Sequence, residues 1–370
     1  MKKAVVALKR TSPEKVLGDY AELMRLAGFP EGFDVSARTI LKPDVAWHRF
    51  MPGANPPPWQ LDGVAQACLD AGVHDLSVVL GRAPEVEPHR AELNNRYIPV
   101  YNRHHLEVRY AHEPEDIEWT RYHPRSKLPA LEAIFPEGFR VPSFFLGTNI
   151  IHLSSVRTHV YSGLAGAVKA GFGALLDENR FRCLPRLDEV LVDLLALQRD
   201  IHRGVLAVAD GTTCGDGAGP RCIIPQVKDI IAASSDPLAL DAVLIRILGL
   251  DPLSIPWLRL AESRGLGCAT LDEIEVRGMD ISDLNFGFSI GSTPSVPIRK
   301  WAKAGGLGGR LIRPVIESAV LAEAAARVYH DRLWYPLWGR ASVRTWKQTR
   351  WGRLFERYSI DRDEGIDMTT

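Results

Sequence analysis

The sequence predicts an α/β fold in which a mostly parallel sheet carries helices on both faces, with an inserted small subdomain and a C-terminal helical tail. Three observations lead to this fold class. Short apolar runs typical of buried strands alternate with segments of helical period, an order that produces parallel strands. Glycine-rich stretches follow several of these runs. Finally, 370 residues with 46% hydrophobic content are enough to build one large core.

The first half of the chain contains a complete strand–helix–strand unit. An apolar strand over 38–45 is followed by a proline-rich loop, a helix over 60–73 and a second strand over 74–84. A strand over 2–10 and a helix over 12–29 precede this unit. Its order implies that the two strands of the unit run parallel.

Residues 82–140 interrupt the pattern, since they are rich in Pro, His, Arg and Glu, and we expect an insertion or small subdomain with two or three exposed strands. Afterwards the pattern resumes, with strands over 148–156, 203–210 and 227–235 and helices over 187–202, 236–250 and 255–267. Asp236 is placed to cap the helix that begins at Pro237. We treat 1–316 as one α/β domain and 317–370 as the tail, which opens with a predicted helix over 317–333.

Composition excludes several classes of protein. Lys plus Arg and Asp plus Glu both number 45, so no overall positive field favours nucleic acid. The five cysteines are scattered without a CxxC pair, which argues against a disulfide framework, a zinc ribbon and an iron–sulfur cluster motif. The apolar run near the N-terminus is too short for a secretion signal, and no run reaches the length of a membrane span. We therefore expect a cytoplasmic protein.

Polar groups fall at three predicted strand ends, where ligands of parallel sheets bind. These are Lys42, the segment from Thr158 and His159 to Lys169, and Asp210. Histidine transfers protons near neutral pH and lysine holds anions, so His159, Lys169 and Asp210 are the predicted catalytic residues and Lys42 and Thr158 predicted ligand contacts. The alternative is a tightly packed helix through small residues, with the lysine facing solvent.

The stretch 209–220, "ADGTTCGDGAGP", is predicted to be a glycine-rich loop that wraps a ligand through Asp216, Gly217 and Gly219. Asp210 and Asp216, with His159, are candidate ligands of a divalent cation. The alternative is an Asx-type turn in which the glycines serve the backbone. Asp241, one turn into its helix, would neutralise a lysine of the site.

A histidine-rich run, "YNRHHLEVRYAHEPED", suggests a metal site through His104, His105, Glu107 and His112. No second ligand pair at the usual spacing supports it, and we favour a solvated strand.

The tail packs tryptophans among arginines over 331–358. This combination suits a membrane surface. It equally suits a helix docked on the protein itself, which we favour because the tryptophans form no single stripe.

Four motifs, in this order, resemble the bacterial and archaeal family called domain of unknown function 362. They are "LKPDV", "RTHVYSGLAGAVKAGFG", "DGTTCGDGAGP" and "DPLALDAV", and the resemblance covers about residues 36–80 and 145–280. It implies an α/β fold and a site at His159, Lys169, Asp210 and Asp241, and it implies no known reaction.

The sequence departs from the family pattern at several positions. The iron–sulfur module that some members carry is missing. The substituted positions are Asp44 for asparagine, Arg157 for lysine, Ala170 for asparagine and Asp216 for glutamate.

Together these features favour an enzyme, an isomerase or an oxidoreductase, that binds a small anionic substrate or cofactor at the strand ends. His159 would be the general acid/base, with Asp210 or Asp216 orienting it or binding a metal. One alternative is a non-catalytic carrier of a ligand or cofactor. Another is a peripheral membrane protein that acts on a lipid-like substrate. The cofactor and the oligomeric state stay open.

Overall fold

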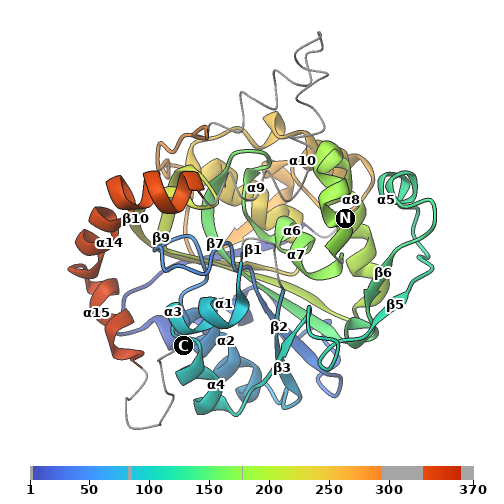
Figure 1. Ribbon diagram of the computed structural model, residues 1–370, viewed down its shortest axis with the longest axis horizontal. Helices are drawn as coiled ribbons and strands as arrows, with labels where there is room; N and C mark the ends of the chain where they lie inside the picture. The colour runs from blue at the N-terminus through green and yellow to red at the C-terminus, as the bar shows by residue number, and fades with distance from the viewer. Residues whose placement is uncertain (1–2, 82–85, 177, 294–327, 360–370) are drawn as a thin grey trace.

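The computed structural model describes residues 3–81, 86–176, 178–293 and 328–359, and its centre is a nine-stranded sheet (Figure 1). The strand order is β11-β1-β10-β9-β7-β2-β3-β4, with β8 paired to β7. The strands β9, β7, β2, β3 and β4 run parallel to one another, and β11 is parallel to β1. In contrast, β10 is antiparallel to both β9 and β1, and β8 is antiparallel to β7. The predicted mostly parallel α/β sheet is therefore confirmed. The strand bounds are β1 Ala4–Arg10, β2 Thr39–Pro43, β3 Leu76–Leu80, β4 Glu107–Tyr110, β5 Trp119–Arg121, β6 Arg140–Pro142, β7 Asn149–His159, β8 Gly163–Leu164, β9 Val205–Ala218, β10 Cys222–Ser234 and β11 Ile274–Arg277.

Helices cover both faces of the sheet, as predicted (Figure 1). The helices α1, α2 and α4 pack on one face, and α6, α8, α9 and α10 pack on the other. Side chains alternate between these two cores along β7, so that Ile151 joins the first core and Ile150 the second. The helix bounds are α1 Val16–Leu26, α2 Pro58–Asp70, α3 Pro88–Asn94, α4 Ile98–His104, α5 Pro129–Ile134, α6 Ala167–Ala170, α7 Phe172–Leu175, α8 Leu187–Ile201, α9 Pro237–Leu248, α10 Pro256–Ser263, α14 Arg340–Lys347 and α15 Arg350–Arg357. The shorter or irregular helices are η1 Ser143–Phe145, η2 Glu178–Arg186, η3 Pro252–Ser254, η4 Leu271–Glu273 and η5 Tyr329–Gly339.

Local signals in the sequence placed several elements correctly. The predicted strand–helix–strand unit is β2, α2 and β3, with the two strands parallel. Asp236 caps α9 as expected, because its carboxylate accepts hydrogen bonds from the backbone N–H groups of Leu238 and Ala239 at 2.9 and 3.2 Å.

The predicted glycine-rich loop over 209–220 is wrong, because β9 continues to Ala218 and pairs with β10 as a long hairpin. The glycines serve close packing. A Cβ on Gly215 would lie 2.4 Å from Cδ1 of Ile223 and 3.0 Å from Cβ of Arg157. Glycine composition therefore marked a place where strands approach closely rather than a flexible loop.

Between the two halves of the domain, residues 86–140 carry α3, α4, α5 and three short strands. The strand β4 extends the main sheet beside β3, whereas β5 and β6 form a separate two-stranded sheet. The first part of this predicted insertion, 82–85, lies outside the described residues.

The C-terminal helices dock on the body of the protein, in agreement with the favoured alternative (Figure 1). Trp346, Trp351 and Phe355 are buried in the same core as α1 and α2. The indole of Trp351 lies 5.1 Å from that of Trp59 and donates to the carboxylate of Asp229 at 2.7 Å. The predicted domain boundary at 316 and most of the predicted helix over 317–333 lie outside the described residues. Within the described part of the chain, no helix is both long and apolar enough to cross a membrane.

Candidate functional site

Five polar side chains interact at the carboxyl ends of β2 and β7, and we call them the cationic cluster: Lys42, Asp44, Arg157, His159 and Lys169. Lys42 and Arg157 are buried in the protein, with exposed fractions of 3% and 0%. Lys42 is the last residue but one of β2, and its Nζ donates to the carbonyl of Pro43 at 3.0 Å. Positive charge is thus concentrated at the edge of the sheet where ligands of such folds bind.

Asp44 and Arg157 form the closest ion pair of the cationic cluster, with Nη2 of Arg157 2.6 Å from Oδ2 of Asp44. Burial alone would raise the pKa of the Asp44 carboxyl. The charges of Arg157, Lys169 and Lys42 outweigh burial and lower that pKa to about 2. Nη1 of Arg157 donates to the Ser155 carbonyl at 3.3 Å, and its buried Nε finds no acceptor among the described residues.

His159, the last residue of β7, is held in one tautomer by its neighbours. Its Nδ1 lies 3.3 and 3.2 Å from the backbone N–H groups of Tyr161 and Ser162, which can only donate. Nδ1 is therefore the acceptor, and the ring proton of the neutral form is assigned to Nε2. Burial, together with the charges of Lys169 and Arg157, holds the pKa of His159 well below its usual range. The ring is neutral at pH 7 and presents an N–H donor.

Lys169 lies on α6, and Asp241 of α9 fixes the start of that short helix. The carboxylate of Asp241 accepts from the N–H groups of Ala167 and Val168 at 2.7 and 2.9 Å. Burial raises the pKa of Asp241 to about 7. A Cβ on Gly166 would lie 2.1 Å from Oδ1 of Asp241, so glycine is required for this approach. Asp241 thus positions the helix of Lys169.

Asp210 lies apart from the cationic cluster and accepts four hydrogen bonds. Tyr20 Oη and Trp59 Nε1 donate to one carboxylate oxygen at 2.6 and 3.0 Å, and Oγ1 and the backbone N–H of Thr212 donate to the other at 2.6 and 2.9 Å. Burial nevertheless raises the pKa of Asp210 to about 6. In the sheet Asp210 pairs with Ser155 of β7. Ser155 lies four residues before His159, so Asp210 is about 13 Å from the level of His159 along the strand direction.

The remaining predicted contacts join β7 to the hairpin. Oγ1 of Thr158 donates to the carbonyl of Gly217 at 2.8 Å, and a Cβ on Gly219 would lie 1.7 Å from the carbonyl oxygen of Thr158. Asp216 accepts from Nε2 of Gln226 at 3.1 Å and from the N–H of Ser289 at 3.0 Å. These contacts hold the end of β7, next to the cationic cluster, against the hairpin of β9 and β10.

The structure therefore brings Lys42, His159 and Lys169 into one electrostatic group, while Asp210, Asp216 and Asp241 make separate contacts. Asp44 and Arg157 are the members that sequence reasoning did not select. A signal existed, because Asp44 directly follows the Lys-Pro motif and Arg157 shares a strand face with His159 two residues on.

Two sets of histidines in the region 86–140 contact carboxylates. Nε2 of His104 lies 2.7 Å from the buried carboxylate of Asp62. Among the described residues, the group with the spacing of metal ligands is His89, His112 and Glu113. It shares only His112 with the set suggested by the histidine-rich run.

Comparison with known proteins places the cationic cluster inside a matched family region. The family described as "Domain of unknown function (DUF362)" matches residues 39–246, more than half of the chain, and confirms the resemblance drawn from the motifs. A thylakoid-associated protein of Synechocystis is 31% identical over 131 residues, which are 32% of this chain and 37% of that protein. The chain thus spans little more than a third of that relative. A crystal structure of a protein from Thermotoga maritima aligns with 73% of this chain and 61% of its own, at 10% identity and a TM-score of 0.38.

Proposed function

This chain belongs to the DUF362 family, and from that premise and the geometry of the cationic cluster we propose that it binds a small anion, a carboxylate or phosphate group, at the ends of β2 and β7. The observation that carries the proposal is a pair of N–H donors in a positive environment. Nε of Arg157 finds no acceptor among the described residues, and every hydrogen bond recorded for His159 goes to Nδ1, which leaves its Nε2–H for a ligand.

Electrostatics favour an anion over a neutral ligand. Lys42, Arg157 and Lys169 all lower the pKa of the Asp44 carboxyl, so their positive charges act at one place. A second negative charge would gain from the same cations, and charge-assisted hydrogen bonds to a buried guanidinium are about twice as strong as neutral ones.

We extend the proposal to catalysis through His159. A neutral imidazole N–H that donates to a ligand oxygen stabilises negative charge as it develops on that oxygen. Isomerases and oxidoreductases that act on carbonyl acids can use such a donor. In this proposal Arg157 and Lys169 hold the acid group, and His159 polarises the adjacent carbonyl.

Titration with inorganic phosphate and with malonate, followed by calorimetry, tests the binding step. We expect Lys169→Gln to weaken binding about tenfold or more, since a hydrogen bond to a charged group contributes about 1.5–3 kcal/mol. Lys127→Gln, at an exposed lysine of the 86–140 region, is the matched control. The proposal fails if neither anion binds, or if both lysine variants lose the same affinity.

Two variants of His159 test its role as a donor. His159→Gln keeps an N–H near the position of Nε2, whereas His159→Ala removes it. We expect His159→Gln to retain most of the phosphate affinity and His159→Ala to lose it. Equal affinity in both variants and the wild type would assign the ligand to other groups.

As a second candidate function, we propose that the protein acts at a membrane surface. The observation in favour is an exposed apolar face on η5, where Leu333, Leu337 and Trp338 have exposed fractions of 51%, 63% and 51%. Arg332 and Arg340, also exposed, flank this face. The relative from Synechocystis carries "thylakoid-associated" in its name.

Sedimentation with vesicles containing anionic lipid tests this candidate. Replacing Leu333, Leu337 and Trp338 by serine should abolish co-sedimentation, whereas Leu253→Ser, at an apolar side chain exposed by 45% elsewhere, should not. Equal partitioning of both variants and the wild type would remove the membrane proposal and leave the anion site unaffected.

A further inference from the structure

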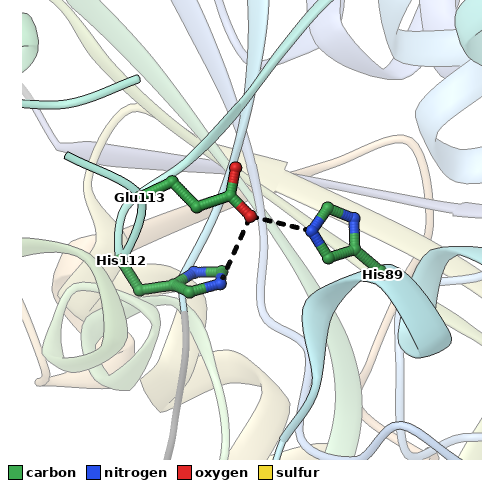
Figure 2. A group of neighbouring side chains, drawn as sticks. All are labelled: His89, His112 and Glu113. Atoms are coloured by element: carbon green, nitrogen blue, oxygen red, sulfur yellow. Dashed lines mark hydrogen bonds and ion pairs between the residues drawn. The ribbon is translucent and has the colours of Figure 1, made fainter. Parts of the chain in front are cut away.

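Three potential metal ligands meet where α3 begins and β4 ends (Figure 2). His89 is the second residue of α3, and His112 and Glu113 lie in the turn that follows β4. Figure 2 shows the Glu113 carboxylate between the two imidazole rings. Its Oε1 lies 2.8 Å from Nε2 of His89 and 3.6 Å from Nε2 of His112, and one ligand atom of each residue lies within 4.8 Å of the other two.

A second carboxylate orients His89. Oε1 of Glu92 lies 3.4 Å from Nδ1 of His89 and accepts the hydroxyl of Tyr110 at 2.8 Å. The Glu92 side chain is only 7% exposed, so that this support is fixed in the protein. A histidine that binds a metal through one nitrogen commonly donates its other N–H to a carboxylate, and Nδ1 of His89 is placed to do so.

Both ring nitrogens of His89 face carboxylate oxygens, Nδ1 that of Glu92 and Nε2 that of Glu113. A divalent cation bound at Nε2 would be shared by His89, Glu113 and His112 together.

We propose that His89, His112 and Glu113 form a binding site for a divalent transition metal ion, with Zn²⁺ as the preferred ion and solvent completing its coordination. Two imidazoles and one carboxylate suit zinc, whereas calcium and magnesium require oxygen ligands. Tetrahedral zinc with bonds of about 2.0–2.1 Å sets its ligand atoms about 3.3 Å apart. The observed contacts of 2.8 and 3.6 Å bracket that value.

The site can adjust to the ion and would join two elements. His89 and Glu113 have side-chain exposures of 54% and 36%, so both can move by the fraction of an ångström required, while His112, at 16%, is held more firmly. The bound ion would link α3 to the end of β4, the edge strand of the main sheet. β4 lies two strands from β2 in the sheet, about 10 Å away, and the metal site shares no residue with the cationic cluster.

Calorimetric titration of the chelator-treated full chain with Zn²⁺ alone tests the proposal. We expect one ion per chain and a higher thermal midpoint with zinc than without it, since a ligand that binds only the folded state stabilises it. His89→Gln and His112→Gln should each weaken binding about a hundredfold or more, and Glu92→Gln about 10- to 100-fold. His123→Gln, at an exposed histidine outside the group, should bind like the wild type.

Two results would overturn the proposal. One is that the wild type binds no zinc. The other is that His89→Gln and His112→Gln bind one ion with unchanged affinity, which would assign the zinc to other residues. Circular dichroism of each variant without metal separates loss of the ligand from loss of the fold, and the exposed His89 variant is expected to keep the wild-type spectrum.

Discussion

Replacing Asp44 by asparagine should destabilise the empty protein and strengthen its binding of anions at the same time. The carboxylate of Asp44 is the partner of Arg157, which is 0% exposed. The Asp44→Asn change would keep the size of the side chain and remove its charge. The guanidinium would then remain buried among Lys42 and Lys169 with less compensation.

The pKa of Asp44 gives the magnitude. Its fall from 3.8 to about 2 corresponds to about 2.5 kcal/mol of stabilisation, since each pKa unit is worth about 1.4 kcal/mol. Because this carboxyl has a lowered pKa in the folded state, the stabilisation is complete above pH 3.8 and is lost as pH falls toward 2. About half of it remains at about pH 3.

Urea unfolding followed by tryptophan fluorescence measures this difference. At pH 7 we expect Asp44→Asn to have a free energy of unfolding about 2–3 kcal/mol below that of the wild type. At pH 3 this difference should shrink by about half. Added phosphate should bind the variant more tightly than the wild type, because the phosphate no longer competes with Asp44 for Arg157. Phosphate should therefore restore part of the lost stability.

Two outcomes would refute this reasoning. A loss below about 0.5 kcal/mol at pH 7 would mean that Asp44 does not compensate a buried charge. Weaker phosphate binding by the variant would mean that Asp44 takes part in binding rather than competing with the anion.

Two further predictions concern the docked C-terminal helices and the contact that positions the helix of Lys169. Trp351→Ala should lower the free energy of unfolding by about 3–5 kcal/mol and speed up proteolysis of the C-terminal helices. Trp338→Ala, at an exposed position, should lower it by less than about 0.5 kcal/mol. Equal effects of the two changes would contradict docking through Trp351. The pKa of Asp241 is raised to about 7, so the folded protein holds the proton of this carboxyl more tightly than the unfolded protein does. The contribution of Asp241 to the free energy of unfolding should therefore fall as pH rises from about 4 to 7. Asp241→Asn should remove that part of the pH dependence in urea unfolding at about pH 5 and 8, and an unchanged slope would assign it to other groups.

Much of the fold could be predicted because local patterns determined it. Apolar runs of strand length and amphipathic helical segments identified β1, β2, β3, β7, α2, α8 and α9. The hairpin of β9 and β10 was missed, since glycine and aspartate are typical of turns and the reason for Gly215 and Gly219 is contact with other parts of the chain. Those contacts are tertiary, and no local pattern in one sequence encodes them.

The same error explains why Asp210 was assigned to the site. A strand that ended at Asp210 would present its carboxylate at the edge of the sheet beside His159. β9 instead continues for eight residues to Ala218, so Asp210 lies in mid-strand and faces Tyr20 and Trp59. The position of a strand end, rather than the chemistry of the residue, decided which carboxylate joined the lysines.

Two of the four positions at which the sequence departs from the pattern of the resemblance contact each other, and this yields a final prediction. Asp44 stands where asparagine is usual and Arg157 where lysine is usual, and their side chains form the 2.6 Å ion pair. An added negative charge offsets an arginine that, unlike lysine, stays charged in any protein environment. The double variant Asp44→Asn/Arg157→Lys should therefore be more stable than Asp44→Asn alone, since the smaller, more flexible ammonium can turn toward neighbouring carbonyls.

A double-mutant cycle in urea measures this coupling. We expect the double variant to lose less free energy of unfolding than the sum of the two single losses, by about 1 kcal/mol or more. Changes at residues in direct contact are commonly non-additive in this way. Phosphate affinity should be lower in the double variant than in Asp44→Asn alone, because lysine lacks the Nε–H donor of Arg157 on which the proposed anion site depends. Additive costs would show that the two substitutions are independent, and the ion pair would then be no adaptation of one residue to the other.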